Sequence, residues 1–67
     1  MAVARVTKLT AASSKGWQEA VEEGLKRANK TLRGITGLEV IGMKAHIERR
    51  KITEYRVTLE ITFILEG

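Results

Sequence analysis

The chain of 67 residues contains no cysteine, no aspartate and only one histidine, His46. Without cysteine there can be no disulfide and no thiolate zinc site. One histidine cannot build an all-histidine metal site within a chain. The eight acidic residues, all glutamates, still allow a carboxylate site for a hard cation such as calcium. Because there is no cysteine nucleophile, and His46 has no serine or aspartate near it in the sequence, we do not expect an enzyme.

Long apolar stretches are also missing, and no segment is long enough to span a membrane. The N-terminus alternates polar and apolar residues without the apolar core of a signal peptide, so we expect a cytoplasmic protein with no membrane partner. The net charge of +4 is compatible with nucleic acid or anionic ligands. However, bases and acids are interleaved, and only Arg49-Arg50-Lys51 forms a cluster. Nucleic-acid binding is the less favoured interpretation, since no recognised motif supports it.

The length of the chain predicts a single domain over residues 1–67 with a small core. A chain of this size buries about 60% of the surface that its unfolded form exposes, so disulfides, a metal or other subunits usually stabilise it. Because disulfides are excluded, association with other subunits is the stabilising device that the sequence leaves most available.

Apolar residues at helical spacing predict one amphipathic helix from Trp17 to about Arg33. Ser13 or Ser14 is the expected N-cap, and Gly34 is the expected left-handed residue that ends the helix. The apolar face consists of Trp17, Ala20, Val21, Gly24, Leu25, Ala28 and Leu32.

Two details of this helix carry further expectations. Glycine inside a helix costs up to about 1 kcal/mol relative to alanine, so Gly24 on the apolar face indicates a close approach to a sheet. On the opposite face, Glu22 and Lys26, like Glu23 and Arg27, have the i, i+4 spacing of stabilising ion pairs.

Segments with β-branched residues predict strands at Ala2–Thr10, Gly37–Glu48 and Thr53–Leu65. The last is the most regular, because its odd positions are mostly apolar and its even positions mostly polar. The connection Arg49–Lys51 is too short for a crossover, so the last two strands should form an antiparallel hairpin. The element order is therefore β-α-β-β.

Alternation also predicts the faces of the two hairpin strands. Strict alternation places Ile41, Met43, Ala45 and Ile47 on one face, and Leu38, Val40, Gly42, Lys44 and His46 on the other, with Ile64 also on this far face. The even positions Glu54 to Thr62 predict a solvated ladder with cross-strand ion pairs to Lys44 and His46.

The hairpin should overhang the helix. Its last strand would span more than about 40 Å, whereas a helix of about 20 residues covers about 30 Å. The overhanging apolar residues would be exposed on a monomer, so packing alone predicts association with other subunits.

Short matches to one family run in order along nearly the whole chain. They are Ser13, Trp17, Glu19-Ala20, Arg27-Ala28, Thr31-Leu32, Glu39-Val40, Glu54-Tyr55, Val57, Phe63 and Leu65-Glu66. In this order and spacing the chain resembles the dodecins. The resemblance implies an α+β fold with a three-stranded antiparallel sheet partly wrapped around one helix. It also implies self-association into a hollow homododecamer built of trimers.

Known dodecins mostly bind flavins, and the resemblance places two positions of that site on this chain. A tryptophan just before the Glu-Val of the second strand stacks on the flavin ring, and this position is Gly37. A glutamine after the tyrosine of the third strand hydrogen-bonds the ring edge, and this position is Arg56. Glycine cannot stack, a loss on the order of 1–3 kcal/mol by analogy with base stacking, and arginine donates but cannot accept. We therefore expect FMN, riboflavin or FAD to bind weakly or not at all in the usual mode.

Three functions remain open. The first is a non-enzymatic dodecin-like oligomer that binds, stores or buffers a small ligand, with flavin as the family's ligand. The second is a similar shell that binds a metal ion such as calcium, or a small anion held between Arg56 and its symmetry mate. The third is a small basic nucleic-acid-binding protein.

Overall fold

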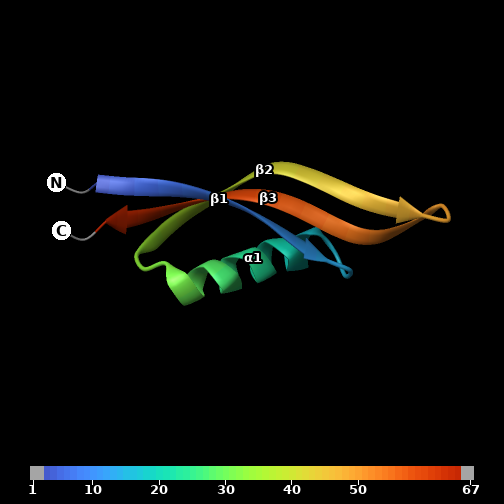
Figure 1. Ribbon diagram of the computed structural model, residues 1–67, viewed down its shortest axis with the longest axis horizontal. Helices are drawn as coiled ribbons and strands as arrows, with labels where there is room; N and C mark the ends of the chain where they lie inside the picture. The colour runs from blue at the N-terminus through green and yellow to red at the C-terminus, as the bar shows by residue number, and fades with distance from the viewer. Residues whose placement is uncertain (1–2, 66–67) are drawn as a thin grey trace.

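A computed structural model describes residues 3–65 as a three-stranded antiparallel sheet with one helix on one of its faces (Figure 1). The elements are β1 (Val3–Ser13), α1 (Trp17–Thr31), β2 (Ile35–Glu48) and β3 (Lys51–Leu65). The strand order is β1-β3-β2, so the last strand of the chain lies in the middle of the sheet. The expected β-α-β-β order and the antiparallel hairpin are confirmed.

The first strand and the start of the helix differ from expectation. β1 continues through Ala11 and Ala12 to Ser13, because these residues pair with β3 along a register that runs to Ser13 opposite Tyr55. The residue at the N-cap is Gly16, and no side chain caps the helix. Ser13 instead accepts a hydrogen bond at Oγ from the backbone N–H of Lys15, at 3.0 Å. The predicted serine cap is therefore wrong.

The helix ends earlier than expected and not at the glycine, because Leu32 is already extended, with φ of −111° and ψ of 144°, and Gly34 lies two residues beyond it. Leu32 is the C-cap, and its N–H donates to the carbonyl of Ala28 at 2.8 Å. Gly34 follows with φ of +73°, and its carbonyl accepts from the N–H of Ile64 at 2.9 Å. The left-handed glycine thus reverses the chain and joins the start of β2 to the end of β3.

The core lies between α1 and the middle of the sheet. The helix packs mainly on β1 and β3 and hardly on β2. Val57, Leu59 and Ile61 of β3 are completely buried there. A Cβ built on Gly24 would lie 2.6 Å from Cδ1 of Leu59 and 3.2 Å from Cβ of Ala11. The close approach predicted at Gly24 is confirmed.

A β-bulge changes the faces of β2. The register shifts between Val40 and Gly42, so that Leu38 pairs with Ile61 while Lys44 pairs with Arg56. Since paired residues of antiparallel strands share a face, Leu38 lies on the helix side and Lys44 on the other. Leu38 accordingly packs against the core. Placing Leu38 and Val40 on the far face was wrong, because strict alternation assumed a strand without an extra residue.

The tip of the hairpin is a two-residue turn formed by Arg49 and Arg50, between the pair Glu48 and Lys51. Both arginines have positive φ, 53° and 68°. A two-residue hairpin turn of this kind favours Asn-Gly, and a left-handed backbone costs other residues about 1–2 kcal/mol each. The tip therefore stores backbone strain.

Replacing Arg49 with asparagine and Arg50 with glycine should raise the free energy of unfolding by about 1–2 kcal/mol. Urea denaturation followed by the fluorescence of the single tryptophan would measure it. The matched control is Arg49→Gln with Arg50→Gln, which removes the same charge but keeps the strain. If both variants gain equally, the stabilisation comes from charge and not from the turn.

The hairpin extends well beyond the helix (Figure 1), in a molecule with principal extents of 52 × 19 × 13 Å. The overhang carries apolar side chains on its helix side that nothing in residues 3–65 covers. Met43, Ile47 and Ile52 are 54%, 62% and 47% exposed. The predicted overhang is therefore present. Within residues 3–65, no helix combines the length and apolar character needed to cross a membrane.

Candidate functional site

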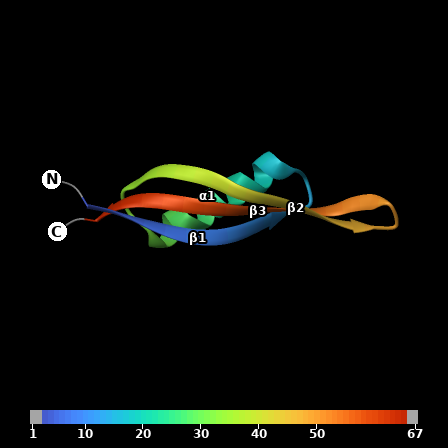
Figure 2. The same cartoon turned by 90° about the horizontal axis from the view of Figure 1, so that it is seen from above.

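The sheet face that points away from α1 is here called the open face, and Figure 2 views the strands from this side. Its members follow from the strand register, in which directly paired residues share a face. They are Val6, Lys8, Thr10 and Ala12 of β1, Glu54, Arg56, Thr58, Glu60 and Thr62 of β3, and Gly37, Glu39, Gly42, Lys44 and His46 of β2. Most are polar, so the open face offers charged groups and hydroxyls to a ligand, whereas the face under the helix is lined by apolar side chains.

Gly37 and Arg56 both lie on the open face, but far apart. Gly37 pairs with Thr62, which is six residues beyond Arg56 in β3. At about 3.3 Å per residue this places them roughly 20 Å apart. A single chain therefore does not bring the two positions together, and a ligand that touches both would need a second chain.

The position of Gly37 is open in front. A Cβ built there would meet only the side chain of Thr62, at 3.8 Å for Cβ, which is an ordinary contact. The glycine therefore offers a ligand neither an aromatic surface nor a charge, while leaving space for a side chain.

Arg56 lies in a different environment, beside a shallow depression of about 280 Å³. Lys44 of β2 pairs with Arg56 of β3. Two residues further along β3, Thr58 pairs with Thr10 of β1. The two threonine hydroxyls are 3.3 Å apart. Gly42 opposite Thr58 has no side chain to fill the space. Two cations and two hydroxyls thus surround a hollow that suits an anionic group.

The ion pairs of this face run along strands rather than across them. Nε of Arg56 donates to Oε1 of Glu54 at 2.5 Å, two residues before it. Nε2 of His46 lies 3.2 Å from Oε2 of Glu48 in the same way. Within residues 3–65 Lys44 forms no ion pair. The predicted cross-strand pairs to Lys44 and His46 are wrong, and Lys44 keeps its charge available.

Carboxylates are also present, but not in a set that one chain could use for a metal. Glu39 of β2 directly opposes Glu60 of β3, and Lys8 of β1 lies on the other side of Glu60. Residues 3–65 contain no group of three or more potential ligands that could hold a metal ion. A cation at the glutamate pair would need ligands from another chain.

Sequence reasoning did not single out Thr10, Thr58 and Gly42 as neighbours of Arg56. The pairing of β1 with β3 joins residues nearly fifty positions apart, and no short motif reveals that register. Gly42 did carry a signal, because a glycine inside a strand pattern often marks a bulge.

Comparison with known proteins places this geometry in one family. A family model described as Dodecin matches residues 3–66. Dodecin of Thermus thermophilus is 36% identical over 64 residues, which is 96% of this chain and 93% of that protein.

Solved structures agree with the sequence match. A mutant of Thermus thermophilus dodecin superposes with a TM-score of 0.96 at 34% identity over the full length of both chains. Dodecin from Streptomyces coelicolor gives 0.94 at 32% identity, over 98% of this chain and 94% of the other. Calcium dodecin from Mycobacterium tuberculosis, described as calcium chelating, gives 0.83 at 27% identity, over 97% and 93%. With its fold and its sequence in agreement, the chain belongs to the dodecin family.

Proposed function

We propose that this chain is a non-enzymatic small-ligand-binding dodecin that assembles into a closed homododecamer of trimers. Family membership and the uncovered apolar overhang support the assembly, because an apolar surface of this kind on a monomer marks a contact with other chains. The proposed role is to bind, store or buffer its ligand in the cytoplasm.

We infer that the ligand is held through an anionic group at the open face rather than by stacking of a flavin ring. The observation that carries this inference is the depression between Lys44 and Arg56, where two cations and two threonine hydroxyls converge. Arginine and lysine bind phosphate and carboxylate groups through charge-assisted hydrogen bonds. The stacking position, in contrast, holds only Gly37. Among flavins, FMN and FAD would therefore bind through their phosphates, and riboflavin least.

Titration of riboflavin and FMN against the assembled protein tests this function through the quenching of flavin fluorescence. We expect no quenching by riboflavin at micromolar concentration, and measurable binding of FMN that is lost at high salt, because screening weakens exposed charge contacts. Changing Lys44 and Arg56 together to glutamine should remove the FMN binding. Tight quenching of riboflavin would contradict the proposal, since riboflavin has no phosphate and can bind tightly only through contacts with its ring.

Calcium is the second candidate ligand. It is favoured by the direct opposition of Glu39 and Glu60, since like charges opposite each other destabilise a strand pair unless a cation joins them. The chelating relative from Mycobacterium tuberculosis adds support. Calorimetric titration with calcium, compared with a Glu39→Gln variant, separates this candidate from the anion site. Equal heats from both proteins would exclude the glutamate pair.

The assembly can be tested at the overhang. Ile47 is 62% exposed in the single chain, so a charged side chain at this position should have little effect on the stability of the single chain. If neighbouring subunits cover it, Ile47→Glu buries an unpaired charge and should break the particle into small species. Native mass analysis should give about twelve chains for the parent protein. Glu48→Gln at the next position is the matched control, and a variant particle of unchanged mass would show that Ile47 lies outside the interface.

A further inference from the structure

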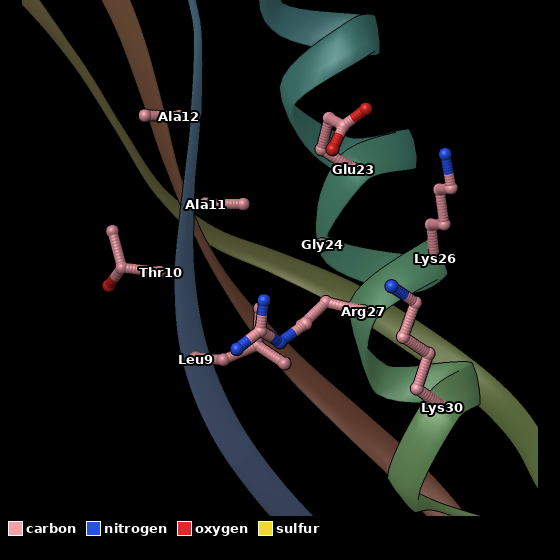
Figure 3. Close-up of a pocket in the computed structure, with 9 residues that line it drawn as sticks. All are labelled: Leu9, Thr10, Ala11, Ala12, Glu23, Gly24, Lys26, Arg27 and Lys30. Carbon is pink, nitrogen blue, oxygen red and sulfur yellow. The ribbon is translucent and has the colours of Figure 1, made fainter.

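A groove on the helix side of the sheet, opposite to the open face, has no role in the function proposed above. It runs between β1 and the second half of α1 and has a volume of about 510 Å³ (Figure 3). This is within the usual range of small-molecule sites, roughly 300–1,000 Å³. Leu9, Ala11 and Gly24 supply its apolar floor. It is open because β1 is an edge strand with no further strand beside it in residues 3–65.

One wall of the groove is strongly basic. Lys26, Arg27 and Lys30 line it, with Glu23 as the single acid. The ion pairs expected from the i, i+4 spacing, Glu23 with Arg27 among them, are not formed. Among residues 3–65 no ion pair involves any of the three bases. In Figure 3 the guanidinium of Arg27 reaches across the groove toward Leu9, and the side chain of Lys30 rises toward Arg27.

Bases near the end of a helix have an ordinary explanation, because they interact favourably with the helix dipole. This accounts for Lys30, which lies in the last turn. It does not account for Arg27, which leaves its natural partner Glu23 and extends over an apolar floor. Lys26 and Lys30, at i and i+4, also repel each other on the helix surface. A polyvalent anion among the three bases would relieve this repulsion.

We propose that this groove binds a phosphate monoester with an apolar body. The phosphate would lie among Arg27, Lys30 and Lys26, because the guanidinium fork fits two phosphate oxygens and lysine adds a point charge. The apolar body would lie on Leu9 and Ala11, where it removes apolar surface from water. The basic wall thus binds the phosphate and the apolar floor binds the apolar body of the same ligand.

The test uses 1-naphthyl phosphate as a ligand for the assembled protein. Inorganic phosphate probes the basic wall alone, and 1-naphthol probes the apolar floor alone. Binding is followed through the NMR signals of the methyl groups of Leu9, Ala11 and Thr58. The proposal expects the methyls of Leu9 and Ala11 to shift, and that of Thr58, which faces away, to stay. Each half-probe should bind at least about tenfold more weakly than the whole, because it keeps only one set of contacts.

Arg27→Gln combined with Lys30→Gln should weaken binding of 1-naphthyl phosphate at least about tenfold, since both charge-assisted contacts are lost. The matched control, Lys15→Gln with Lys51→Gln, removes the same charge outside the groove and should change the affinity less than about twofold. Equal losses in both variants would overturn the proposal, as would a shift at Thr58 in place of Leu9 and Ala11. Dissociation of the particle by the Arg27 and Lys30 changes would also overturn it, because a neighbouring subunit would then occupy the groove.

Discussion

Replacing Gly37 with tryptophan should increase the affinity for riboflavin by roughly 5- to 150-fold, the equivalent of the 1–3 kcal/mol that stacking contributes per ring. The backbone can accept the change, because a Cβ at this position meets only Thr62 at 3.8 Å. The side chain would extend from the open face, where the sheet leaves the space empty. Fluorescence quenching of riboflavin by the purified assembly measures the gain.

Two further variants separate stacking from other causes. Gly37→Leu adds apolar surface without a large ring, and should recover only a small part of the gain. Adding Arg56→Gln to the tryptophan variant supplies an acceptor for the polar edge of the flavin ring, and should strengthen riboflavin binding again. The same change should weaken FMN if its phosphate uses Arg56. Unchanged riboflavin affinity in the tryptophan variant would contradict the assignment of Gly37 to the ligand site.

Shortening Leu59 to alanine should cause the largest loss of stability of any single truncation, about 2–5 kcal/mol. Leu59 is fully buried in the middle of the central strand and faces α1 at Gly24. The change removes apolar contacts and leaves a cavity beneath the helix. Urea denaturation at a fixed protein concentration, followed by Trp17 fluorescence, measures it. The concentration must be constant because the stability of an oligomer depends on it.

A substitution at Gly24 tests the close contact between the helix and Leu59 directly. Alanine is normally better than glycine inside a helix by about 1 kcal/mol. Here its Cβ would lie 2.6 Å from Cδ1 of Leu59, so Gly24→Ala should instead destabilise by about 1–3 kcal/mol. Combined with Leu59→Ala the same change should cost much less, since the nearest obstructing atom is gone and only the 3.2 Å contacts with Ala11 and Leu9 remain. Additive effects in the double variant would show that the two residues do not compete for space.

The sequence predicted well those features that arise from neighbours along the chain. The helical spacing from Trp17, the hairpin around Arg49 and Arg50, and the close approach at Gly24 all follow from local patterns, and the structure contains each of them. Alternation in the last strand also identified Val57, Leu59 and Ile61 as buried, because β3 itself has no extra residue between Glu54 and Phe63.

The errors occurred where a long-range contact overrode a local rule. A single extra residue between Val40 and Gly42 reversed the face of Leu38, and alternation alone cannot reveal such a bulge. Ser13 belongs to β1 because of its pairing with Tyr55, which left it unavailable as a cap. Exposed ion pairs were also poorly predicted, since each is worth little and side chains such as Arg27 have other positions available.

The candidate site shows the same division. The two positions carried over from the family, Gly37 and Arg56, could be named from short motifs. The register of the three strands determines how far apart these two positions lie along β3. It also determines that Thr10 and Lys44 are neighbours of Arg56. Only the folded sheet determines which side chains surround a ligand.

The central place of β3 has a consequence for synthesis of the chain on the ribosome. β1 emerges first but has no strand partner until β3, the last element, has also emerged, since Val3 pairs with Leu65. Until then β1 offers two unpaired edges, which invite pairing with other nascent chains. Such distant pairing also slows folding. A cell that makes this protein must therefore keep β1 out of aggregates until β3 has emerged as well.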